Sequence, residues 1–101
     1  PEGAAAPEAG FRALFFHLEG GSVELLAFER ELAGVDPRVC RPAPGGVQHV
    51  AFRVGDLDGA LAAFERSGGR ILEGFPRQGF HGRIAFLEHP DIPGLVELIG
   101  G

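Results

Sequence analysis

Three segments of the sequence each carry one side chain that can bind a metal ion or move a proton. The segments are GSVELLAF at 21–28, GVQHVAF at 46–52 and GLVELIG at 94–100, and the side chains are Glu24, His49 and Glu97. Alternate side chains of a β-strand share a face, so each segment can bury its apolar residues and present its polar residue on the other side. One imidazole and two carboxylates on a common sheet face suit a divalent metal. The three residues therefore predict a metal site and favour an enzyme.

The second half of the sequence predicts a strand, a helix and three further strands. The stretch VQHVAFRV at 47–54 alternates in strand fashion, and Asp56 can cap a helix that the glycines at 68–69 end. Strands are predicted over 70–75, 83–89 and 95–100, separated by turn-rich stretches. The apolar stripe of the helix is expected to pack on Val50, Phe52 and Val54, on the opposite side of the strand from His49.

The first half of the sequence predicts less structure. Residues 1–10 mix Pro, Gly, Ala and Glu without periodicity, which indicates a flexible arm. Residues 11–28 predict a β-hairpin around a Gly-Gly turn. The prolines and glycines of residues 29–45 predict a linker, with one helical turn at 28–33. Residues 11–101 are expected to form a single α+β domain.

Composition excludes several classes of protein. The 101 residues suit one domain, and a net charge of −5 with scattered arginines makes nucleic acid an unsuitable partner. The nine aromatic residues are all Phe, which favours core packing over an aromatic belt at a membrane. No apolar run approaches the roughly 20 residues that span a bilayer, so no membrane partner is expected. The single Cys40 cannot form an internal disulfide, and together with the absence of a signal-like N-terminus this predicts a cytoplasmic protein.

Several motifs of the sequence resemble one known superfamily. They are the strand GVQHVAF, the turn PRQGFHGR at 76–83, the strand AFL at 85–87, the turn HP at 89–90 and the strand GLVEL at 94–98. In this order they resemble the second module of the vicinal oxygen chelate superfamily, which includes glyoxalase I, bleomycin-resistance proteins and extradiol dioxygenases. Within the superfamily they are most similar to the methylmalonyl-CoA epimerases. Residues 11–28 resemble the end of the first module, and residues 46–101 resemble a complete βαβββ module.

The resemblance implies a ligand set and a reaction. His49 matches the histidine ligand of the second module, Glu97 the glutamate of its closing strand, and Glu24 the Glu or Gln ligand of the first module. The family's first histidine has no counterpart, since the sequence starts after that point. The implied activity is that of a metal-dependent isomerase or epimerase that moves a proton through a metal-stabilised enolate, on a small-molecule substrate such as an acyl-CoA. Glu97 or Glu24 would take the proton, and the metal would be cobalt, nickel, manganese, zinc or iron.

The sequence is also compatible with other functions and with other roles for these residues. A bleomycin-resistance-like protein would bind a ligand in the same cavity without a metal, and glyoxalase I-like or extradiol dioxygenase-like enzymes would use related sites. The two glutamates could instead pair with Arg53 or Arg83. His81 and His89 lie in turns, where a histidine more commonly holds the turn by hydrogen bonding than performs catalysis. An incomplete first module exposes strand edges, which favours a homodimer.

Overall fold

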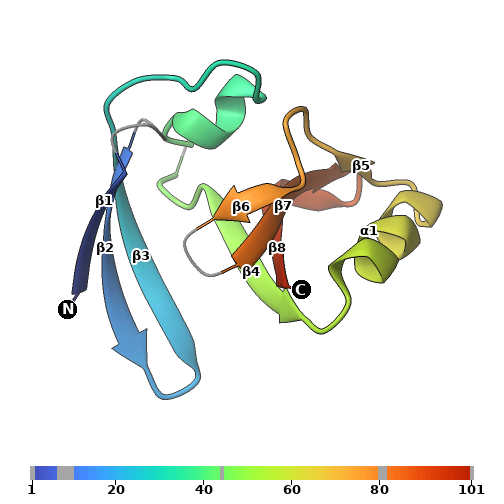
Figure 1. Ribbon diagram of the computed structural model, residues 1–101, viewed down its shortest axis with the longest axis horizontal. Helices are drawn as coiled ribbons and strands as arrows, with labels where there is room; N and C mark the ends of the chain where they lie inside the picture. The colour runs from blue at the N-terminus through green and yellow to red at the C-terminus, as the bar shows by residue number, and fades with distance from the viewer. Residues whose placement is uncertain (1, 7–10, 44, 80–81, 101) are drawn as a thin grey trace. The chain divides into compact units, whose positions relative to one another are not determined.

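The computed structural model describes residues 2–6, 11–43, 45–79 and 82–100. The chain divides into two compact units, Pro1–Ala33 and Gly34–Gly101 (Figure 1). The boundary between them falls within the stretch predicted as a linker, and each unit has a β-sheet of its own. The architecture is α+β, as the sequence predicts.

The first unit is a three-stranded antiparallel sheet in the order β1-β2-β3. The strands are β1 (Glu2–Ala6), β2 (Phe11–Leu18) and β3 (Gly21–Phe28). The predicted hairpin corresponds to β2 and β3. Strand β1 differs from the flexible arm expected over residues 1–10: residues 2–6 pair with β2, while 7–10 lie outside the described residues. A β-ladder is made by backbone groups, so the lack of side-chain periodicity did not reveal this strand.

The second unit contains a mixed five-stranded sheet and one α-helix. Its elements are β4 (His49–Val54), α1 (Leu57–Arg66), β5 (Arg70–Ile71), β6 (Arg77–Gly79), β7 (Gly82–His89) and β8 (Ile92–Gly100). The strand order is β4-β8-β7-β5, with β6 paired to β7. The predicted succession of strand, helix and strands is present, and β6 is a further short strand in a stretch that the sequence analysis had assigned to turns.

Helix α1 begins and ends where its sequence signals predict. The Asp56 side chain accepts a hydrogen bond from the backbone nitrogen of Gly59 (3.1 Å), which caps the first turn. At the other end, Gly68 has a φ of 101°, a conformation that favours glycine and turns the chain toward β5. The buried side chains of Leu57 and Leu61 lie one turn apart and define the face of α1 that packs on the sheet.

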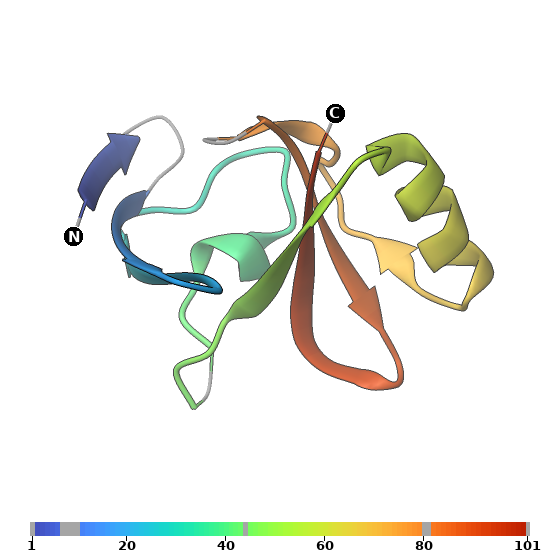
Figure 2. The same ribbon diagram turned by 90° about the horizontal axis from the view of Figure 1, so that it is seen from below.

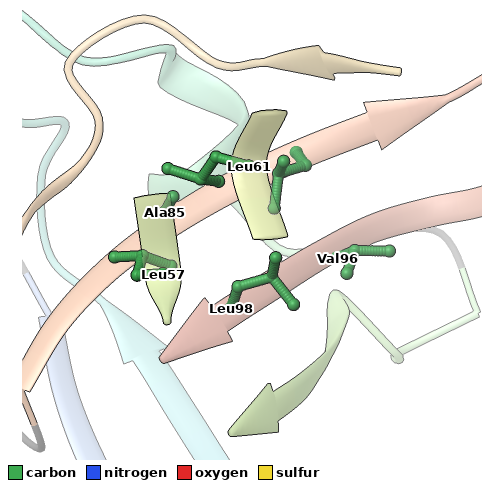
Figure 3. Packing of buried hydrophobic residues seen from close by; sticks show 6 residues of the cluster. Leu57, Leu61, Ala85, Val96 and Leu98 are labelled. Atoms are coloured by element: carbon green, nitrogen blue, oxygen red, sulfur yellow. The ribbon is translucent and has the colours of Figure 1, made fainter. Parts of the chain in front are cut away.

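The largest core cluster lies between α1 and the two central strands. It consists of Leu57, Leu61, Ala85, Leu87, Val96 and Leu98 (Figure 3). The predicted contact of the helix with Val50 and Phe52 was wrong, because these side chains are 52% and 55% exposed, and only Val54 of the three packs against the cluster. Strand β4 lies at the edge of the sheet, so a helix that connects it to β5 at the opposite edge crosses over β8 and β7 instead.

A second cluster occupies the other face of the same sheet, which we call the open face. It consists of Leu72, Phe86 and Leu95, with Val39, Phe75 and Ile84 packed around it. Val39 belongs to a short 3₁₀ helix, η2 (Pro37–Cys40), and Figure 2 shows η2 and α1 on opposite sides of the strands. The helical turn expected at 28–33 is absent from those residues, and η2 forms later, where Pro37 follows the capping side chain of Asp36.

Neither of the helices in the described part of the chain has the length and apolar character needed to cross a membrane.

We predict that Leu57→Ala lowers the free energy of unfolding by about 2–5 kcal/mol, because Leu57 is fully buried and a cavity would remain between α1 and the sheet. Chemical denaturation measures this change. Val47→Ala is the control, since Val47 is 71% exposed and its truncation should change stability by less than about 0.5 kcal/mol. Equal effects of the two substitutions would contradict the assigned core.

Candidate functional site

His49 and Glu97 lie side by side on the open face. Strands β4 and β8 are parallel, with His49 opposite Leu95 and Ala51 opposite Glu97, so His49, Leu95 and Glu97 share one face. His49 Nε2 is 3.0 Å from Glu97 Oε1, and the two side chains are only 11% and 12% exposed. The structure thus brings together two of the three side chains that the sequence analysis assigned to a metal site.

Apolar side chains enclose this pair. The rings of His49 and Phe86 are 4.8 Å apart at an angle of 77°, an edge-to-face contact, and Phe86 lies opposite Glu97 in the β7–β8 ladder. Leu95 and Phe86 are themselves buried. Since water is largely excluded, electrostatic interactions of the imidazole and the carboxylate are stronger here than at an exposed surface.

Gln48 is part of the site, and the sequence analysis missed its contribution. Its side chain is buried, and Nε2 donates to the backbone oxygens of Arg38 (3.2 Å), Val39 (3.2 Å) and Arg41 (2.7 Å). Its Oε1 lies 2.8 Å from Nδ1 of His49. Strand alternation would send neighbouring side chains to opposite faces, but Gln48 precedes the first residue of β4 and escapes that rule.

The backbone segment that holds Gln48 is itself tied to the sheet by charged groups. Arg38 pairs with Asp36 (2.9 Å) and with Glu88 near the end of β7, and Glu88 also accepts from Arg70 (2.6 Å). Hydrogen bonding to Arg38 lowers the pKa of both the Asp36 and the Glu88 carboxyl groups below their ordinary values of 3.8 and 4.5. This network fixes η2, whose carbonyl oxygens surround the Gln48 amide.

Glu24 lies on β3 of the first unit, opposite Phe15 in the β2–β3 ladder, and is half-buried. His49 and Glu97 belong to the second compact unit. The assignment of Glu24 as a third ligand therefore stays a prediction. Arg83, which was considered as a partner for the glutamates, pairs with Asp58 on α1 (3.1 Å).

The remaining histidines of the described chain hold turns. His89 Nε2 lies 3.0 Å from the backbone oxygen of Ser67, and its Nδ1 accepts from the backbone nitrogen of Asp91 (3.0 Å), which joins the end of α1 to the β7–β8 turn as predicted. His17 contacts the Ser22 hydroxyl across its hairpin (3.0 Å). His81 lies outside the described residues.

His49 and Glu97 fit a divalent metal as two members of a ligand set. Two ligand atoms that each lie about 2.1 Å from one ion and meet it at a right angle are about 3.0 Å apart, and the separation of Nε2 and Oε1 is 3.0 Å. No group of three or more His, Cys, Asp and Glu side chains among the described residues is arranged to hold a metal ion. A complete metal site thus requires donors beyond this pair.

Comparison with known families agrees with this architecture. Residues 2–86 match the model of the glyoxalase/bleomycin resistance protein/dioxygenase superfamily. The chain belongs to this superfamily. The resemblance inferred from the sequence motifs is thereby confirmed.

Two curated relatives of the chain are named as epimerases. The chain is 32% identical over 95 residues to the ethylmalonyl-CoA/methylmalonyl-CoA epimerase of Cereibacter sphaeroides, covering 91% of this chain and 71% of the relative. It is 26% identical over 83 residues to the mitochondrial methylmalonyl-CoA epimerase of Dictyostelium discoideum, covering 82% of this chain and 50% of that protein. The chain thus spans about half the length of the second relative.

Among solved structures, the methylmalonyl-CoA epimerase from Mycobacterium tuberculosis superposes with a TM-score of 0.72 at 24% identity, covering 99% of this chain and 69% of that one. At this identity the likeness establishes the fold.

We predict that Arg38→Met weakens the pH dependence of stability in acid. The lowered pKa values of Asp36 and Glu88 mean that the unfolded chain binds more protons as the pH falls, so their contribution is present above the ordinary values of 3.8 and 4.5 and is lost below them. Removing Arg38 should cost about 1 kcal/mol at neutral pH, since Arg38 is 46% exposed and water screens its ion pairs, and should flatten the decline in acid. Urea denaturation across this pH range tests it, with Arg66→Met in α1 as control. Parallel acid declines in the wild type and Arg38→Met would contradict the role of Arg38.

Proposed function

We propose that this chain is an epimerase-like enzyme that moves the α-proton of an acyl-CoA substrate, as the names of its relatives suggest. The observation that carries the proposal is the buried His49–Glu97 pair on the open face of the sheet. A carboxylate and an imidazole nitrogen at 3.0 Å, largely shielded from water, are suited to binding a cation and to exchanging a proton. The two residues lie at positions that the sequence motifs had assigned to metal ligands.

The proposed chemistry is a proton transfer at the carbon beside the thioester carbonyl. The Glu97 carboxylate is the candidate to take the α-proton from one face of the carbon, and delivery of a proton to the opposite face by a second acid would invert the configuration. His49 Nε2 and Glu97 would hold a divalent ion, which would supply a Lewis acid that stabilises the negative charge developing on the substrate. Phe86 and Leu95 would keep water from the carbon while it lacks its proton.

Glu24 has two possible roles in this proposal, as a further ligand or as a second proton-accepting carboxylate. A substitution separates them. Glu24→Ala should lower the metal content if Glu24 is a ligand, and should leave the metal content intact while slowing proton exchange if Glu24 is a base.

We predict that the chain binds one divalent ion, that His49→Ala loses it, and that Glu97→Gln slows epimerisation by about 100-fold or more, the range typical of a missing general base. Elemental analysis of protein incubated with cobalt measures the metal, and exchange of the α-proton of methylmalonyl-CoA in deuterated water measures the reaction. Glu65→Gln is the matched control, because Glu65 is an exposed glutamate of α1.

The alternative function is binding without chemistry, in the manner of bleomycin-resistance proteins. The open face would then bind a ligand, and the His49–Glu97 pair would form a polar contact with that ligand. Wild-type chain that binds no metal after incubation with cobalt, and exchanges no proton, would favour this alternative.

We also propose that the chain forms a homodimer. Strand β4 is the edge of its sheet in the second unit, and Val47, Val50 and Phe52 at this edge are each more than half exposed. An edge strand with apolar side chains favours pairing with a second copy, and burial of the exposed half of Val50 or Phe52 would contribute about 1 kcal/mol for each.

We predict a dimer at micromolar concentration in sedimentation experiments, and a monomer for Phe52→Glu, because a charge would then have to be buried at the edge. Leu18→Glu is the control, since it makes the same change at an exposed leucine of the first unit. A monomeric wild type would exclude the dimer.

A further inference from the structure

The orientation of the Gln48 amide is fixed by its surroundings. Three backbone oxygens, from Arg38, Val39 and Arg41, lie within 3.2 Å of Nε2. The amide has two N–H donors on its nitrogen and only acceptors on its oxygen. Turning the amide over would place Oε1 at 2.7 Å from the oxygen of Arg41, where two acceptors would repel each other. Oε1 must therefore point toward His49.

The fixed amide determines which nitrogen of His49 carries a proton. Oε1 lies 2.8 Å from Nδ1 and can only accept a hydrogen bond, so Nδ1 must donate one. We propose that Gln48 is a positioning residue that keeps a proton on Nδ1 of the His49 imidazole, so that Nε2 is the unprotonated nitrogen of the neutral ring and faces Glu97. The role acts through the ring of His49 and requires no contact between Gln48 and a substrate.

This arrangement prepares the site for a cation. In the neutral Nδ1–H form, Nε2 turns a lone pair toward the Glu97 carboxylate at 3.0 Å, and these two acceptors repel each other unless a proton or a metal ion lies between them. In metal sites, a hydrogen bond to the second nitrogen of a ligating histidine fixes its tautomer and raises its basicity. This consequence rests on the proposed function, whereas the tautomer itself follows from the hydrogen bonds of the chain alone.

The network also explains why a glutamine suits position 48. The side chain must donate to the carbonyl oxygens of the η2 segment and at the same time accept from an imidazole. A carboxylate could accept but would face those three carbonyl oxygens without a proton to offer. An apolar side chain of similar length could neither donate to the carbonyl oxygens nor accept from the imidazole. It would leave the carbonyl oxygens without this donor and the tautomer of His49 undetermined.

The test compares Gln48→Met with Gln78→Met, because these are the two glutamines of the sequence and Gln78 is exposed. Nitrogen-15 NMR of the histidine side chains in alkaline solution identifies the protonated ring nitrogen of His49 in metal-free protein. Zinc titration then gives the affinity of each variant. We expect the Nδ1–H form in the wild type and in Gln78→Met, a mixture of tautomers in Gln48→Met, and a zinc affinity lower by about 10–100-fold in Gln48→Met only.

Two results would overturn the positioning role. One is a wild-type His49 that carries its proton on Nε2. This measurement needs no variant, so it remains decisive even if Gln48→Met fails to fold. The other is a folded Gln48→Met chain that keeps the Nδ1–H form and the wild-type zinc affinity. Wild-type protein with the Nδ1–H form that neither binds zinc nor exchanges a substrate proton would contradict the proposed function and would support the positioning role.

Discussion

The parallel register of β4 on β8 is the constraint on which the site depends. It sets His49 opposite Leu95 and brings its ring within reach of Glu97. A slip of one residue would turn His49 to the face covered by α1 and would place Val50 beside Glu97. The register is enforced from both faces, because β8 presents Val96 and Leu98 to the helix and Leu95 to the open-face cluster. The same packing that stabilises the sheet therefore fixes the functional pair.

Local patterns in the sequence were sufficient to predict the elements that such patterns describe. Alternation of apolar residues located β4, β7 and β8, and the capping side chain of Asp56 marked the start of α1. Alternation also placed His49 and Glu97 each on one face of its own strand, whereas their adjacency depends on the pairing of β4 with β8. What alternation could not supply was the order of the strands, which depends on contacts between segments distant in sequence. The helix was consequently assigned to β4 instead of to β7 and β8.

The features that the sequence did not predict depend on backbone groups. Strand β1 pairs through its main chain, and the carbonyl oxygens that hold Gln48 come from a segment, 37–41, whose sequence indicates only a turn. Gln48 itself is an ordinary polar residue until its neighbours in space are known. Its place immediately before a predicted ligand was the one available signal, because the second ring nitrogen of a metal-binding histidine almost always has a hydrogen-bond partner.

The face of the second sheet under α1 carries the larger core cluster, and the open face carries the smaller cluster together with the His49–Glu97 pair. The residues that pack against α1 alternate along β7 and β8 with residues that face outward around the His49–Glu97 pair. Ile84 and Ile99, which lie opposite each other on the open face and are only partly buried, can therefore vary with little effect on the packing beneath α1. A superfamily built on such a sheet can acquire new substrates by changing partly buried residues on one side of it, while natural selection for folding acts most strongly on the other.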